Sequence, residues 1–495
     1  MPRSNGCITC KIRRKKCDEQ KPSCAACMRN VLICAWGEMS RQTAKLSSAN
    51  TILPRQRRRK SSSTQALSAF RSRPDSPSPP NTELLLRSLP RSRHSPMFQE
   101  LRQSHPQLSR SQAAFLYTFF LHKAAQVVCI RDEPSNPFLH VLIPVAMQSD
   151  MILHALLAFS GVIYLQNNRR GHFAHAVWEQ YAQVLRSLKH SLVIYSQGQN
   201  DLAVFLMITC LILCAIETTN ADTHEHAFLH LRAAQDLFSA AEAHCSNTPL
   251  FSFAAEFYLY IVALLPSCTS PKDHSETMLR SEADVQLCSR ILMRNQTPLV
   301  GMLCGNAFTL YQWIPQVYEI SIAIHDNLIH AGVGGLPMHM CLSRLRAHSV
   351  IQSWTPEIQN DDDGYRCGLI YQLALLSLLD MSPLNERGTA EGSVSYRRQL
   401  ILNFMQLLRA IPPESNHTTV LCWPLAVLGA YAEEPEDRAF VRTYLFRMVK
   451  KYNLGNMYQT IALLELVWKS QHLLDSGPRC LTTAMEIQGF RIMFT

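Results

Sequence analysis

The sequence has no apolar run long enough to suggest a membrane span. Its longest such stretch, LAVFLMITCLILCAI at residues 202–216, is closed by Asp201 and Glu217. A membrane-spanning helix needs about 20 apolar residues, so this stretch favours a buried core helix and we expect no membrane partner. The polar N-terminus MPRSNGC lacks the apolar region of a secretory signal. We therefore expect an intracellular chain with reduced thiols.

Catalytic motifs are also missing. The sequence contains no HExxH, GxSxG, GxGxxG or Walker-type loop, so it does not indicate an enzyme. The tetrapeptide THEH at residues 223–226 places its two histidines at i and i+2, which do not share a helical face. It predicts a solvent-exposed helix start rather than a metal site. The acidic runs NDDDG (360–364) and EEPED (433–437) predict solvated loops, with activation-type surfaces as the alternative.

Signals for β-structure are nearly absent. The dipeptide at 363–364, Asp-Gly, is the lone hairpin-type turn, and it lacks flanking alternation. The chain is 47% hydrophobic and 17% charged, as expected for a mostly globular protein. From residue 109 to 495, apolar residues recur with helical spacing and show no fixed-period repeat. We predict a large all-α domain of about a dozen helices over 109–495.

Two segments illustrate the helical pattern. Ser109 followed by Gln112 is typical of a capping box, and Asp150 is a candidate cap for a second helix. The expected buried faces are Ala113, Leu116, Tyr117 and Phe120 in the first segment, and Leu153, Leu156, Leu157 and Ser160 in the second.

Residues 37–108 have the composition of a linker. They are rich in Ser, Pro, Arg and Gln and show no sustained period, which predicts a disordered basic segment. They contain no coiled-coil heptads, so they do not support dimeric binding, although the body could form a homodimer. The run RQRRRK indicates a nuclear localisation signal or an extra DNA contact, with a solvated charge patch as the alternative. Its basic residues are Arg55, Arg57, Arg58, Arg59 and Lys60.

Charge is unevenly distributed. The net charge is +10, but the first 96 residues hold 20 Lys/Arg against 5 Asp/Glu, and the remainder holds 28 against 33. A strongly basic end on a slightly acidic body predicts a polyanionic partner for that end, either nucleic acid or anionic lipid.

Of the 17 cysteines, eleven are scattered through the body. We predict that they are buried and act as small apolar side chains. The other six are Cys7, Cys10, Cys17, Cys24, Cys27 and Cys34. The last three repeat the spacing of the first three, shifted by 17 residues. Residues 1–36 hold too few apolar side chains to fold by burial, and an intracellular location argues against disulfides. Zinc–thiolate bonds are the remaining way to stabilise this unit.

Counting ligands indicates two zinc ions. One tetrahedral zinc would leave two cysteines unused, whereas two zinc ions need eight ligand positions from six cysteines. Two cysteines must then bridge, and the repeat makes Cys7 and Cys24 the natural candidates. Between Cys10 and Cys17, five of six residues are basic: Lys11, Arg13, Arg14, Lys15 and Lys16. A short helix here, held to zinc at both ends, could enter a major groove.

The cysteine spacing, with KIRRKKCD and KPSCAAC around it, resembles the fungal Zn2Cys6 binuclear-cluster transcription factors. The resemblance implies two short helices, with one zinc on Cys7, Cys10, Cys17 and Cys24 and the other on Cys7, Cys24, Cys27 and Cys34. It implies a nuclear, sequence-specific regulator of RNA polymerase II genes that binds double-stranded DNA and contacts the transcription machinery or co-regulators.

The resemblance also assigns roles to the basic residues. Arg13 and Arg14 would face the bases of CGG-like triplets, where an arginine fork can bind guanine O6 and N7. Lys11, Lys16 and Lys21 would contact phosphates. Lys15 departs from the family, in which many members have an apolar residue, and would add a phosphate contact. The alternative is a zinc-dependent protein-interaction or co-regulator module for which DNA binding is secondary.

The body carries a second resemblance. The segments DMILHALLAFSGVIYLQ and HLRAAQDLF are similar to the fungus-specific helical regulatory domain that follows such clusters. Ala233 stands where the second motif often has glycine. The implied role of 109–495 is regulation of transcription.

Overall fold

The structure is a computed structural model of the chain. It describes residues 16–20, 108, 110–131, 135–167, 173–222, 225–269, 274–295, 301–330, 336–356, 361–380 and 390–495. The chain divides into two compact units, Met1–Leu89 and Pro90–Thr495. Within the first unit only residues 16–20 are described, so the two short helices expected for 1–36 and the linker expected for 37–108 lie outside the described residues.

The second unit is helical, and its described residues contain no β-strand. This confirms the all-α prediction. Its α-helices are α6 (Ser111–Phe119), α7 (Ala125–Val127), α8 (Ile143–Ala146), α9 (Asp150–Asn167), α10 (Ala174–Ser196), α11 (Ala203–Thr219), α12 (His226–Cys245), α13 (Pro249–Val262), α14 (His274–Asn295), α15 (Phe308–Tyr311), α16 (Trp313–His330), α17 (Met338–Gln352), α18 (Asp362–Asp380), α19 (Ala390–Ala410), α20 (Cys422–Ala430), α21 (Pro435–Tyr452), α22 (Gly455–Lys469) and α23 (Cys480–Gln488).

The number of helices exceeds the expected dozen because some of them are short segments of a longer, interrupted helix. The helices α6 and α7 are joined by a π-helical turn at Phe120–Ala124, so the three elements run without a break. Pi-type turns of this kind are insertions within a continuous α-helix.

The capping box expected at the start of α6 includes Ser109, which lies outside the described residues. The N-cap position belongs to Arg110, whose side chain makes no capping hydrogen bond, and Ser111 is the first helical residue. The expected buried faces are confirmed in both segments, since all eight residues are buried. In α9 the Ser160 hydroxyl donates to the backbone carbonyl of Leu116 at 2.7 Å, which satisfies a polar group inside the core.

The longest apolar run forms α11, the central helix of the first half. Two helical stretches, Asn200–Thr219 and Pro249–Ser267, are long and apolar enough to cross a membrane, but 83% and 94% of their apolar windows lie buried. They are therefore core helices of this unit. Helix α12 packs along α11, and α9 lies against both α10 and α11.

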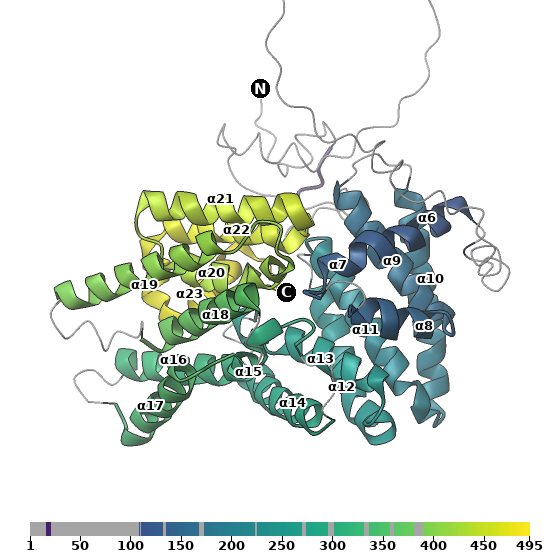
Figure 1. The fold of residues 1–495 in the computed structure, drawn as a ribbon, viewed down its shortest axis with the longest axis horizontal. Coiled ribbons are helices and arrows are strands. Elements are labelled where there is room, and N and C mark those ends of the chain that lie inside the picture. The colour runs from purple at the N-terminus through teal and green to yellow at the C-terminus, as the bar shows by residue number, and fades with distance from the viewer. Residues whose placement is uncertain are drawn as a thin grey trace, which may run out of the picture. The chain divides into compact units, whose positions relative to one another are not determined.

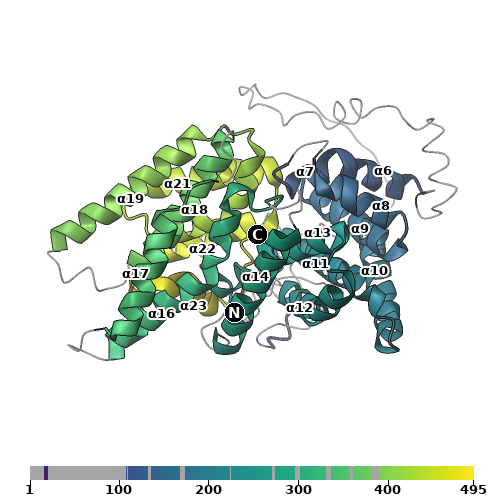
Figure 2. The same cartoon turned by 60° about the horizontal axis from the view of Figure 1, so that its bottom comes forward.

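Helices α9 and α10 cross closely at Gly161. A Cβ atom at this position would lie 2.3 Å from Cγ2 of Val177, which is fully buried on α10. The crossing therefore requires a residue without a side chain. It fixes the position of α10, which Figures 1 and 2 both place at the outer edge of the helical unit.

The two views also separate the unit into an N-terminal half, α6 to α12, and a C-terminal half that includes α17, α19 and α21 (Figures 1 and 2). The final residues of the chain lie between these halves. Met493 is buried, and its Sδ lies 3.5 Å from Sγ of Cys214 on α11. The last segment thus connects the two halves through the core.

The body cysteines occupy the positions expected of small apolar residues. Nine of the eleven are buried, and only Cys245 and Cys341 are partly exposed. Burial raises the pKa of the Cys210 thiol to about 12, so it stays protonated and unreactive at neutral pH.

Candidate functional site

Cys17 is the one expected zinc ligand within the described residues. Its side chain is partly exposed, and the backbone N–H of Glu19 donates to its Sγ at 3.4 Å. Glu19 has a left-handed φ of 60°. Hydrogen bonds from neighbouring groups orient metal ligands, so this contact is compatible with a metal-binding sulfur.

Lys16 precedes Cys17 and is exposed, as a phosphate-contacting residue must be. The other expected ligands and contacts lie outside the described residues. They are Cys7, Cys10, Cys24, Cys27 and Cys34; Lys11, Arg13, Arg14, Lys15 and Lys21; and Arg55, Arg57, Arg58, Arg59 and Lys60.

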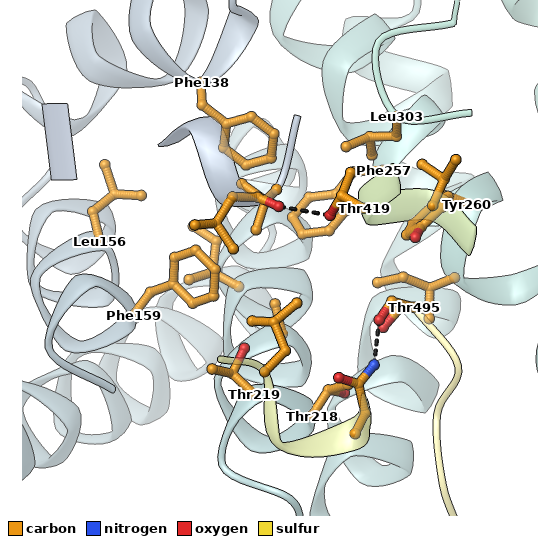
Figure 3. Close-up of a pocket in the computed structure, with 18 residues that line it drawn as sticks. Phe138, Leu156, Phe159, Thr218, Thr219, Phe257, Tyr260, Leu303, Thr419 and Thr495 are labelled. Atoms are coloured by element: carbon orange, nitrogen blue, oxygen red, sulfur yellow. Dashed lines mark hydrogen bonds between the residues drawn. The ribbon is translucent and has the colours of Figure 1, made fainter. Parts of the chain in front are cut away.

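The helical body holds an apolar cavity between its two halves (Figure 3). Its wall includes Phe138 and Phe159 from the N-terminal half, Phe257 from α13, and Thr419 and Thr495 from the C-terminal half. The cavity volume is about 60 Å³, which is small beside the 300–1,000 Å³ of typical ligand pockets. It is therefore a packing space rather than a pocket for a drug-sized molecule.

Hydrogen bonds lie at the edge of this cavity (Figure 3). The Thr419 hydroxyl donates to the carbonyl of Val127 on α7 at 2.8 Å, which joins the two halves. The Asn456 side-chain amide on α22 donates to the carbonyl of Thr495 and, at 3.2 Å, to that of Met493, which holds the final residues against α22. These bonds satisfy polar groups in an apolar setting.

A wider and more polar groove lies between α14, α16 and α17. It has a volume of about 710 Å³, within the range of small-molecule sites. Glu282 and Glu319 lie in its wall, and Gln286 and Gln316 donate to the Glu282 carboxylate at 3.0 and 2.8 Å. Burial and the neighbouring Glu282 raise the pKa of Glu319. The groove can thus accept groups that donate hydrogen bonds or carry positive charge.

Helix α10 presents an apolar stripe to solvent. Trp178, Leu185 and Leu192 are 41%, 39% and 40% exposed and are spaced by seven residues. Tyr181 and Tyr195 each follow a member of this set by three residues. Spacings of seven and three are those of the a and d positions of a coiled coil. We call the set Trp178, Leu185 and Leu192 the α10 stripe.

Sequence reasoning missed the α10 stripe because it sought heptads only in 37–108. The signal was present in WEQYAQVLRSLKHSL, but its exposure depends on how α10 packs against α9. The sequence suggested that the body could form a homodimer but indicated no surface for it. The α10 stripe is a candidate for that surface.

Two family models match this chain. The model of the fungal specific transcription factor domain matches residues 115–492, and the model of the fungal Zn(2)-Cys(6) binuclear cluster domain matches residues 5–43. The first match spans most of the described helices, and the second contains all six clustered cysteines. No solved structure matches the chain.

A curated relative supports the same identification. The chain is similar to the transcriptional activator protein UGA3 of Saccharomyces cerevisiae, with 29% identity over 162 residues. The match covers 32% of this chain and 29% of that protein's length.

Proposed function

Because the chain belongs to the family of fungal specific transcription factors and carries a Zn(2)-Cys(6) binuclear cluster, we propose that it regulates RNA polymerase II genes by reading CGG-like triplets. The chain is a DNA-binding transcription factor and not an enzyme. The match of the cluster model to residues 5–43 supports the finer proposal.

The cluster domain holds two zinc ions on cysteines. We assign Cys7, Cys10, Cys17 and Cys24 to one ion and Cys7, Cys24, Cys27 and Cys34 to the other, with Cys7 and Cys24 bridging. The N–H of Glu19 beside the Cys17 sulfur supports the role of Cys17, because such contacts orient metal ligands. Bound zinc supplies the folding free energy that so small a unit lacks.

The basic segment between Cys10 and Cys17 is the proposed reading surface. Arg13 and Arg14 face the bases, where each guanidinium can donate two hydrogen bonds to a guanine. Lys11, Lys15, Lys16 and Lys21 neutralise phosphates and set the protein's position on the duplex. The exposed side chain of Lys16 supports this division of roles.

We place the protein in the nucleus, in line with its family. The run formed by Arg55, Arg57, Arg58, Arg59 and Lys60 is the proposed localisation signal. A fluorescent reporter fused to residues 50–65 should accumulate in nuclei, and a reporter in which these five residues are replaced by alanine should not. A wholly cytoplasmic parent fusion contradicts the assignment.

The proposed partners are double-stranded DNA, co-regulators or the transcription machinery, and a second copy of this chain. The α10 stripe supports the homodimer. In an antiparallel pair, the exposed side chains of Trp178, Leu185 and Leu192 on one copy would pack against the same stripe on the second copy.

One experiment separates this function from the alternative, a zinc-dependent interaction module. The full chain with zinc is titrated onto random DNA pools, and the selected sites are then measured at several salt concentrations. A transcription factor of the proposed kind selects CGG-like triplets, and its affinity falls with salt as phosphate contacts are lost. Equal affinity for selected and unselected DNA contradicts the proposal, and half-site spacing reports the dimer.

A further inference from the structure

Three metal-ligating side chains meet where α11 passes into α12. They are Glu217 near the end of α11, Asp222 in the connecting loop and His226 at the start of α12. One ligand atom from each lies within 4.8 Å of the other two. His226 is the solvent-exposed helix start that the THEH motif predicts, with a 53% exposed side chain. Its partners come from outside that motif.

The two carboxylates are buried next to each other. Glu217 is 8% exposed, and the Asp222 side chain is 5% exposed. Burial raises the pKa of Glu217, and the neighbouring Asp222 raises it further. Two carboxylates in so small a buried volume repel each other unless a positive charge lies between them. A divalent cation supplies such a charge.

The spacing of the ligand atoms is compatible with a metal site. Nδ1 of His226 lies 3.3 Å from Oδ1 of Asp222, and a ligand atom of Glu217 lies within 4.8 Å of both side chains' ligand atoms. Two ligands bound to one tetrahedral Zn²⁺ at about 2.0 Å each lie about 3.3 Å apart. Small side-chain movements would bring the three groups to one ion.

The remaining oxygens of the two carboxylates are held in place. The Tyr181 hydroxyl on α10 donates to Oε1 of Glu217, and the backbone N–H of Ala227 donates to Oδ2 of Asp222 at 3.2 Å. These bonds hold one oxygen of each carboxylate in place. Outer hydrogen bonds of this kind orient metal ligands and tune their affinity.

The residue before Asp222 is held by the C-terminal half. Ala221 has a left-handed φ of 60°, and its carbonyl accepts from the Gln459 side chain at 3.0 Å. Gly455 packs so closely that a Cβ there would lie 2.5 Å from the backbone nitrogen of Ala221. These contacts fix the backbone next to Asp222.

We propose that Glu217, Asp222 and His226 bind a Zn²⁺ ion, with Tyr181 as a positioning residue and water at the exposed fourth position. The ion joins α11 to α12 and is separate from the two zinc ions of the cysteine cluster. The donor set of two carboxylates and one imidazole suits Zn²⁺, and the open position makes the ion exchangeable.

Native mass spectrometry of the full chain in buffered zinc provides the test. The unsubstituted chain should carry three zinc ions, and Asp222→Asn should carry two under the same conditions. Asparagine keeps the shape and the carbonyl that accepts the Ala227 N–H, so this variant retains the helix start. Tyr181→Phe removes only the outer hydrogen bond and should weaken zinc binding at this site by about 10–100-fold.

The matched control is His244→Gln, which changes an exposed histidine further along α12 and should leave three zinc ions. Cobalt substitution distinguishes the sites, because six thiolates give intense sulfur-to-cobalt absorption and an oxygen–nitrogen site gives only weak visible bands. Two zinc ions in the unsubstituted chain overturn the proposal, as does a third ion that persists in Asp222→Asn. Loss of the cysteine-bound pair would instead overturn the proposed cluster.

Discussion

Oε1 of Glu256 on α13 accepts the backbone N–H of Leu303 at 3.0 Å, although its carboxyl group is fully buried. Its other oxygen has no hydrogen-bond partner among the described residues. Burial raises the pKa of this carboxyl to about 8, and backbone N–H groups of residues 301–303 only partly oppose the shift. Glu256 is therefore a neutral acid in the folded protein at pH 7.

This pKa predicts how stability depends on pH. The unfolded carboxyl has a pKa of about 4.3, so between that pH and about 8 the folded state holds a proton that the unfolded state has lost. The stabilising contribution is complete below the unfolded pKa and declines as pH rises towards the folded pKa, by at most about 1.4 kcal/mol per pH unit. Glu256→Gln should flatten this decline in urea unfolding followed by circular dichroism at pH 5 to 9.

The control for Glu256 is Glu414→Gln, which neutralises an exposed carboxylate. It should leave the pH dependence of the unfolding midpoint as it is in the unsubstituted chain. If Glu256→Gln and the unsubstituted chain lose stability in parallel from pH 5 to 8, Glu256 is ionised in the folded protein and the interpretation is wrong.

The close crossing at Gly161 makes a second prediction. Gly161→Ala places a methyl group against the branched side chain of Val177, which is buried and cannot turn away. Overpacking of this kind costs about 1–3 kcal/mol, which exceeds the gain of about 1 kcal/mol in helix propensity. Urea unfolding should show a net loss, and adding Val177→Ala should recover part of it. A Gly161→Ala protein that is more stable than the unsubstituted chain contradicts the close contact between Gly161 and Val177.

The sequence predicted the features that depend on local pattern. The helical faces of α6 and α9, the central position of α11 and the burial of the body cysteines all follow from apolar spacing and composition. The acidic runs were interpreted as solvated loops, but Asp362 and Asp363 begin α18, and Glu436 and Asp437 begin α21. Acidic residues in the first turn of a helix interact favourably with the helix dipole. The interpretation of these runs as loops did not take this signal into account.

Features that depend on tertiary packing escaped prediction. Glu256 is buried because α13 packs against residues 301–303, and nothing in its own helix distinguishes it from a surface glutamate. Glu217 and His226 lie on different helices, and their ligand atoms come together only in the folded chain. The zinc ligands, by contrast, could be predicted from sequence alone. In a small unit stabilised by metal, the spacing of the cysteines itself indicates the site.

Replacing the proposed reading residues one at a time tests the division between base and phosphate contacts. Arg14→Ala should cost about 1–3 kcal/mol on the selected site and little on scrambled DNA, because a bidentate guanine contact is lost. Lys16→Ala should weaken both DNAs alike and reduce the salt dependence. Fluorescence anisotropy with both duplexes measures these losses. Equal losses for Arg14→Ala on the two duplexes contradict its assignment to the bases.

The bridging assignment predicts different metal losses from two similar substitutions. Cys24→Ser removes a ligand shared by both cluster zinc ions, so the chain should hold two fewer zinc ions than the unsubstituted protein. Cys34→Ser removes a ligand of one ion only, so it should hold one fewer. Native mass spectrometry counts the ions directly. If both variants lose the same number, Cys24 is not a bridge.

The α10 stripe makes the homodimer testable. Leu185→Lys places a charge in the middle of the seam and removes apolar burial worth about 1–3 kcal/mol per copy, so it should raise the dimer dissociation constant by at least tenfold. Leu229→Lys is the matched control, because Leu229 is 62% exposed on α12 and lies outside the stripe. Light scattering during size-exclusion chromatography should show a dimer for the unsubstituted chain and for Leu229→Lys, and a monomer for Leu185→Lys. A monomeric unsubstituted chain at micromolar concentration, or a dimer that survives Leu185→Lys, shows that α10 does not form the interface.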